Sequence, residues 1–183
     1  GREVPAELAS RLKGLAQQLG VPLKSVLLAA HLRVLALVSS QREVLTGLVS
    51  NSRPEEEEGE RVLGLFLNTL PLRLALEDES WRALIGRAFE AERAGLAWRR
   101  YPAGRLKRGE REDLFETAFN YNHFHVYQGL EGRVEVSQPR MFEYTNFTLM
   151  ANFDRAPDGE GLALRLNYDS GQLAAAEVER WAG

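Results

Sequence analysis

Few side chains in this sequence could carry out acid-base or nucleophilic chemistry. The chain has no cysteine, which excludes a thiolate nucleophile, a disulfide framework and a cysteine-based zinc site, and which suits the reducing cytoplasm. Its 3 histidines are His31, His123 and His125. His123 and His125 would share one face of a strand, where two imidazoles can hold a transition metal, but no third ligand is evident. We therefore expect neither a metal site nor a directly bound cofactor.

Asparagine side chains form a second group with chemical potential. An amide can donate to a developing oxyanion or hold a backbone loop, and both uses need a fixed polar group in a dry place. Residues 115–122 alternate a mainly aromatic row with a row that includes Asn120 and Asn122, which predicts a strand. That polar row could line a binding tunnel or face solvent, and the sequence does not decide between the two.

Charged residues gather in two segments. Residues 98–111 are strongly basic and contain Glu110 as their one acid, whereas residues 55–58 are consecutive glutamates. Consecutive glutamates point in different directions and lack cation-site spacing, so we expect a solvated loop. The net charge of −3 and the pI of about 5.7 give no field that would gather nucleic acid or anionic membrane. The basic segment is expected to be an exposed loop or a docking surface for an acidic protein.

Apolar periodicity predicts two N-terminal helices. Leucines at helical spacing follow Pro5 until Gly20 ends the first helix, and a second helix should run from about Pro22 to Val38. The second helix is apolar on nearly every side, so it should be a covered core helix. Charged and polar residues interrupt this longest apolar stretch and no basic leader precedes it, so we expect neither a membrane span nor a signal peptide.

The rest of the chain alternates strands with helices. Strands are predicted at residues 43–50, 68–76, 115–122, 143–153 and 162–168. Pro71 places its strand at an edge, a bulge or a crossing, and the turn at 157–159 predicts that the last two strands pair as a hairpin. Helices are predicted after the N-cap Ser80 and after the cap candidates Asp169 and Ser170. This order predicts a layered α/β (α+β) domain with helices on a mixed sheet.

Several short motifs in a fixed order carry a family resemblance. Residues 47–54 end a strand in an arginine, and after an acidic loop residues 62–73 contain a glycine-aromatic step into Asn-Thr and an arginine two residues after a proline. A Tyr-Pro step at 101–102 and an arginine-containing approach over 111–120 to a strand ending in asparagine follow. Together these segments resemble the C-terminal motifs of the condensation domains of nonribosomal peptide synthetases.

The resemblance implies a two-lobed, chloramphenicol-acetyltransferase-like architecture with a tunnel between the lobes. Residues 1–183 would form the C-terminal lobe. The family signature, His-His-x-x-x-Asp-Gly, belongs to the N-terminal lobe and does not occur in this sequence. The chain alone is therefore expected to supply no catalytic residue.

What the resemblance implies about activity is amide-bond formation between a carrier-bound acyl or peptidyl thioester and a carrier-bound aminoacyl group. The expected partners are the N-terminal lobe and carrier proteins, whose phosphopantetheine arm is the implied cofactor. Two alternatives stay open: a noncatalytic lobe that binds a carrier protein, and an ester-forming acyltransferase of the same fold. A separate lobe would expose the face meant for its partner, so an apolar patch or self-association is expected.

Candidate site residues also follow from the resemblance. The candidates for the tunnel wall are Asn68, Thr69, Asn120 and Asn122. The candidates for a structural hydrogen bond or a phosphate contact are Asn51, Arg53 and Arg73. The candidates for docking an acidic carrier protein are Arg99, Arg100 and Arg108.

Overall fold

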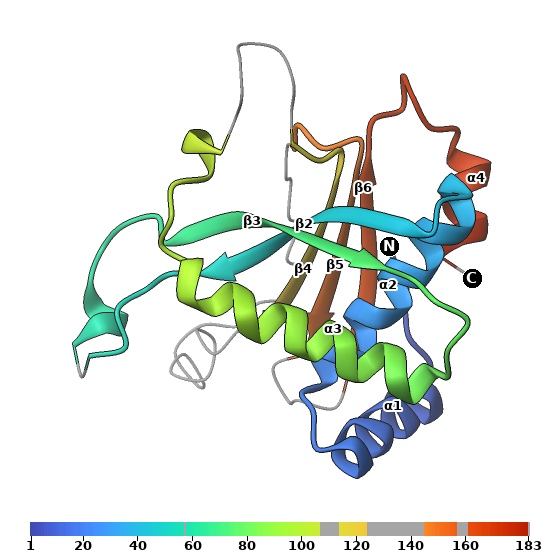
Figure 1. Ribbon diagram of the computed structural model, residues 1–183, viewed down its shortest axis with the longest axis horizontal. Coiled ribbons are helices and arrows are strands. Elements are labelled where there is room, and N and C mark those ends of the chain that lie inside the picture. The colour runs from blue at the N-terminus through green and yellow to red at the C-terminus, as the bar shows by residue number, and fades with distance from the viewer. Residues whose placement is uncertain (57, 107–113, 124–144, 157–160, 183) are drawn as a thin grey trace, which may run out of the picture.

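The structure is a computed structural model that describes the chain except residues 57, 107–113, 124–144, 157–160 and 183 (Figure 1). The helices are α1 (Ala6–Leu19), α2 (Leu23–Ser39), α3 (Trp81–Gly95) and α4 (Ala175–Trp181). The strands are β1 (Arg2–Glu3), β2 (Glu43–Asn51), β3 (Leu67–Ala75), β4 (Thr117–His123), β5 (Leu149–Arg155) and β6 (Leu162–Tyr168). Short 3₁₀ turns are η1 (Gly59–Arg61), η2 (Leu96–Trp98) and η3 (Ala103–Arg105).

The strands form one mixed six-stranded sheet in the order β1-β6-β5-β4-β2-β3. β4 runs parallel to β2 and β5, and the other neighbours are antiparallel. The predicted β5–β6 pairing is confirmed, although β5 begins only at Leu149, and the predicted turn at 157–159 lies outside the described residues. Pro71 sits opposite Gly47 in the edge strand β3, where a residue without an N–H is tolerated. The two-residue strand β1 was not predicted.

The helix ends follow local backbone chemistry. α1 stops at Gly20, whose φ of 66° is left-handed, as the sequence predicts. Ser80 caps α3 by accepting a hydrogen bond from the Ala83 N–H at 3.2 Å, also as predicted. The predicted helix α4 is confirmed, but the predicted cap residues were wrong: its N-cap is Ala174, while Asp169 accepts from the Gly171 N–H and closes the preceding turn.

The hydrophobic core lies between the helices and one face of the sheet. Figure 1 shows α3 running below the β2–β3 hairpin, and both α3 and α1 pack against α2. Phe119, at the centre of this face, is fully buried and lies with its ring 5.4 Å from that of His31 and 5.6 Å from that of Phe153. The largest fully buried apolar side chains besides Phe119 are Leu28, Leu32, Leu84 and Ile85. Each such side chain contributes roughly 1.5–3 kcal/mol by leaving water.

α2 is a core helix over only part of its length. Residues 25–29 are buried, as predicted, but Leu37 near the C-terminal end is 69% exposed. The expectation that α2 is covered on most sides therefore holds for its first turns and not for its last.

His31 is a buried titratable group between α2 and the sheet. Its Nε2 lies 3.2 Å from the Thr46 hydroxyl, which itself accepts a hydrogen bond from the Thr117 hydroxyl at 2.9 Å. Thr46 can therefore give its own proton to Nε2, which suits a neutral imidazole. Burial lowers the pKa of His31 from 6.5 to about 4.

The folded chain should lose stability as the pH falls from 6.5 to about 4, because over that range the unfolded state takes up a proton at His31 and the folded state does not. The full loss is about 3 kcal/mol. Urea unfolding at a series of pH values should show this slope in the native chain and a shallower one in His31→Gln. Equal slopes for the two proteins would contradict the assignment.

Candidate functional site

Asn68 joins the start of β3 to the segment after α3. Its Nδ2 donates to the Arg99 carbonyl at 3.0 Å and to the Tyr101 carbonyl at 2.7 Å, while its Oδ1 accepts from the Thr69 N–H at 3.1 Å. Both donors and the acceptor of this amide are therefore in use. These contacts favour the structural role of Asn68, in which its side chain holds a backbone loop.

Arg53 is enclosed by the loop that follows β2. The Asn51 side chain accepts from the Arg53 N–H at 2.9 Å, and the Arg53 Nη1 donates to the carbonyls of Gly59 at 3.2 Å and Val62 at 2.6 Å. The guanidinium also lies over the Phe66 ring, 4.5 Å from its centroid. These contacts fit the structural role expected for Asn51 and Arg53, and the alternative phosphate contact stays a prediction.

Arg73 pairs with an acid on the neighbouring strand. Its Nη2 lies 2.6 Å from the Glu43 carboxylate, and this hydrogen bond and charge raise the pKa of Arg73. This pair fits the structural role expected for Arg73, but the two side chains are 68% and 53% exposed. An ion pair this exposed adds little stability.

The remaining tunnel candidates lie together on the face of the sheet opposite the helices. Side chains alternate along a strand, so Thr69, Asn120 and Asn122 point away from the core face, whereas Asn68 belongs to the helix side. The Asn120 side-chain amide donates to the side-chain oxygen Oδ1 of Asn152 at 3.1 Å, and the Asn122 side-chain amide donates to the Asp154 carboxylate at 2.7 Å. We call Thr69, Asn120, Asn122, Asn152 and Asp154 the polar wall.

Asn152 and Asp154 are the members of the polar wall that the sequence did not single out, and Asn152 is the more informative of the two. Asn152 is fully buried, and among the described residues its Nδ2 has no hydrogen-bond partner. Leaving a buried donor unpaired costs about 1–3 kcal/mol. The neighbouring charges compensate each other, because Asp154 lies 3.3 Å from Arg165. An unpaired amide donor in a neutral setting suits an uncharged acceptor such as a carbonyl oxygen. An asparagine in the middle of an otherwise buried strand was the available signal.

Aromatic rings border the polar wall. A Cβ at Gly47 would overlap the Phe115 ring, so glycine is needed for this ring to cross β2 beside Thr69. Phe115 in turn stacks on Phe147, with ring centroids 5.7 Å apart. The same side of the sheet therefore offers apolar rings next to amides.

The docking candidates differ in how accessible they are. The Arg99 guanidinium pairs with Glu55 at 2.8 Å and its side chain is 22% exposed. Arg100 is exposed, and so is Arg105, which the sequence did not single out. Arg108 lies outside the described residues.

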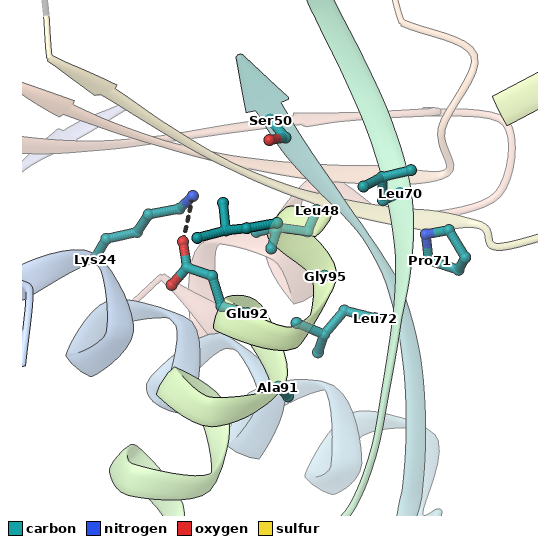
Figure 2. A pocket seen from close by; sticks show the side chains of 10 residues that line it. Lys24, Leu48, Ser50, Leu70, Pro71, Leu72, Ala91, Glu92 and Gly95 are labelled. Atoms are coloured by element: carbon teal, nitrogen blue, oxygen red, sulfur yellow. Dashed lines mark ion pairs between the residues drawn. The ribbon is translucent and has the colours of Figure 1, made fainter. Parts of the chain in front are cut away.

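A small cavity lies on the helix side, between the start of α2, the end of α3 and strands β2 and β3 (Figure 2). Leu48, Leu70 and Leu72 form its apolar walls. Lys24 and Glu92 pair across one side at 2.7 Å, with Ser50 above them in Figure 2. Its volume of about 40 Å³ holds a few waters and cannot take a pantetheine or acyl chain. This cavity is therefore not a substrate tunnel.

An apolar stretch is exposed between η1 and β3. The exposed fractions are 44% for Val62, 97% for Leu63, 86% for Leu65 and 60% for Leu67. We call these residues the apolar rim. They follow directly on the loop that Arg53 holds, so the backbone presents them in a fixed place. Exposed apolar groups in a row are typical of a surface that another protein covers.

The described residues offer neither a cluster of metal ligands nor a single membrane-spanning helix. The part of the chain that the structure describes contains no group of three or more His, Cys, Asp or Glu side chains placed to hold a metal ion. Nor does it contain a single helix long and apolar enough to cross a bilayer; α1 and α2 meet that criterion only jointly, across a bend of 107°. Of the two histidines proposed as possible ligands, His125 lies outside the described residues.

Comparison with known proteins gives a consistent picture. The profile of the condensation domain family matches residues 2–183. The AMB antimetabolite synthetase AmbE of Pseudomonas aeruginosa is 39% identical over 183 residues, which are 99% of this chain and 8% of that synthetase. Malpinin synthetase of Mortierella alpina is 33% identical over 131 residues, 67% of this chain and 2% of its own length.

Solved structures show the same fold. The condensation domain from the monacolin K polyketide synthase MokA has a TM-score of 0.79 at 19% identity, over 100% of this chain and 43% of that one. The first condensation domain of the calcium-dependent antibiotic synthetase has a TM-score of 0.79 at 20% identity, over 98% of this chain and 41% of that one. The chain belongs to the condensation domain family of nonribosomal peptide synthetases, and it spans less than half of these solved domains.

Asn68→Ala should loosen the segment after α3 while the sheet stays intact. Losing two donated hydrogen bonds should lower the free energy of unfolding by about 1–3 kcal/mol and speed amide hydrogen exchange in η2 and η3. Asn167→Ala is the control, because Asn167 lies on the other side of the sheet. Identical exchange in the two variants would show that Asn68 does not hold the loop.

Proposed function

We propose that this chain is the C-terminal lobe of a condensation domain that forms amide bonds in nonribosomal peptide synthesis. The nitrogen of a carrier-bound aminoacyl group attacks the carbonyl carbon of a carrier-bound acyl thioester; a C–N bond forms, the C–S bond breaks, and the carrier thiol leaves with a proton. The N-terminal lobe supplies the His-His-x-x-x-Asp-Gly motif, which this sequence lacks. The relatives named above are synthetases, which supports a peptide product.

The observation that carries the proposal is the polar wall. The helices cover one face of the sheet, and the other face carries Thr69, Asn120 and Asn122 beside an unpaired donor on Asn152, with Asn120 and Asn152 buried. A tunnel for thioester substrates must accept amides and carbonyls along an extended arm without holding a charge. The polar wall, with its neutralised Asp154, is suited to that task.

Partners follow from the same assignment. The apolar rim is the surface we assign to the N-terminal lobe, because its leucines are exposed in the separate chain. The basic segment containing Arg99, Arg100 and Arg105 is the surface we assign to an acidic carrier protein bearing the phosphopantetheine arm. Arg108 belongs to the same segment by sequence and stays a docking candidate.

Asn152→Asp, made in the complete two-lobed domain, tests the polar wall. Aspartate still accepts from Asn120 but no longer donates, so condensation with loaded carriers should slow about tenfold, the effect of one lost hydrogen bond. Asn167→Asp makes the same change on the same face, two strands from Asn120. If both variants are folded and equally active, the polar wall does not contact substrate; a noncatalytic, carrier-binding lobe becomes the better proposal only if the native two-lobed domain forms no amide from loaded carriers.

The double variant Leu63→Ser, Leu65→Ser tests the apolar rim. Each buried leucine contributes roughly 1.5–3 kcal/mol to an interface, so the variant should bind a separately produced N-terminal lobe far more weakly and self-associate less. Leu37→Ser is the matched control, because Leu37 is 69% exposed on α2, away from the rim. Sedimentation and binding curves that do not distinguish the two variants would rule out the rim as the lobe interface.

A further inference from the structure

Two loops that are far apart in sequence meet at one end of the β2–β3 hairpin. The loop between β2 and β3 and the segment from η2 to η3 both extend from that end (Figure 1). The backbone of the second segment is fixed by Asn68, which holds the carbonyls of Arg99 and Tyr101. The side chain of Arg99 then reaches back to Glu55 on the first loop, at 2.8 Å.

The Arg99–Glu55 pair is unequal in exposure. Arg99 is 22% exposed and Glu55 is 76% exposed, so the carboxylate lies on the outer side of the guanidinium. The hydrogen bond from Arg99 and then the charges of Arg99 and Arg100 lower the pKa of Glu55. An approaching anionic group would meet Glu55 before it met Arg99.

A second ion pair on the same loop provides a comparison. Glu58 lies 3.1 Å from Arg61, but both side chains are strongly exposed and only three residues apart. This pair is confined to its own loop. Glu55 and Glu58 thus carry the same charge on the same loop, and of these two pairs only that of Glu55 reaches the basic segment.

We propose that Glu55 is a built-in competitor for docking: its carboxylate occupies the position on Arg99 that a carboxylate of an acidic partner protein takes when it binds. This inference rests on the proposed function, in which the acidic partner is the carrier protein. Because the Glu55 carboxylate is 76% exposed, its ion pair with Arg99 holds little net free energy, and a partner carboxylate can replace Glu55 at small cost. A partner with a single stray acid gains nothing from that exchange, whereas a surface that also engages Arg100 and Arg105 does, which favours a multiply acidic partner.

The test is the affinity of the complete two-lobed domain for the phosphopantetheine-loaded carrier domain of the same synthetase. Glu55→Gln should tighten binding about threefold to fivefold at about 10 mM ionic strength, and the gain should vanish at about 1 M, where charges are screened over a few ångströms. Glu58→Gln removes the same charge and should change the affinity much less. In an Arg99→Gln background, Glu55→Gln should give no gain.

Each other outcome has a meaning. Equal tightening by Glu55→Gln and Glu58→Gln would show that only net charge matters and would overturn the inference. Weaker binding by Glu55→Gln, with thermal unfolding unchanged, would overturn it too, since Glu55 would then assist docking. If the native domain binds the carrier and neither Arg100→Glu nor Arg105→Glu changes that affinity, the docking surface itself is wrong, and the inference fails with it.

Discussion

The burial of one face of a mixed sheet beneath α2 and α3 decides where every other group in this lobe can lie. Phe119, Leu28 and Leu84 fill the space between the layers, and strand alternation then sends every second residue to the opposite face. That face is where Asn120 and Asn152 come together. The polar wall is thus a consequence of the apolar pattern on the same strands, and a one-residue slip in register would bury amides in the core and expose Phe119.

Most helices and strands of this fold can be predicted from the sequence because their signals are local. A left-handed Gly20 ends α1, Ser80 starts α3, and Pro71 marks an edge strand, each through its own backbone chemistry. Strand β1 escaped prediction because two residues carry no periodicity. The start of α4 was missed because the Asp169 side chain satisfies a turn N–H, an alternative that sequence alone does not separate from a helix cap.

The candidate site was less predictable, since its contacts join distant segments. The hydrogen bond from Asn68 to the Tyr101 carbonyl joins residues 33 positions apart, and neither sequence motif indicates that it contacts the other. The placement of Asn68 on the helix side, apart from Thr69, follows from the strand alternation once the register is known. Asn152 could have been found, because an asparagine at the centre of a buried strand has few partners to choose from. The sequence identifies Arg99 as basic, but it does not indicate that Glu55 pairs with it.

The edge strand β3 limits how this lobe can be assembled. An exposed sheet edge is a template for another strand, and a long open edge invites aggregation. Pro71 removes an N–H donor near the middle of β3. The ion pair between Arg73 and Glu43 places charges near the C-terminal end of the same strand. Extending the sheet along this edge is therefore blocked over most of its length. A partner that approaches this edge must therefore associate through side chains, whose shape and charge can be selective, and not by adding a strand to the sheet.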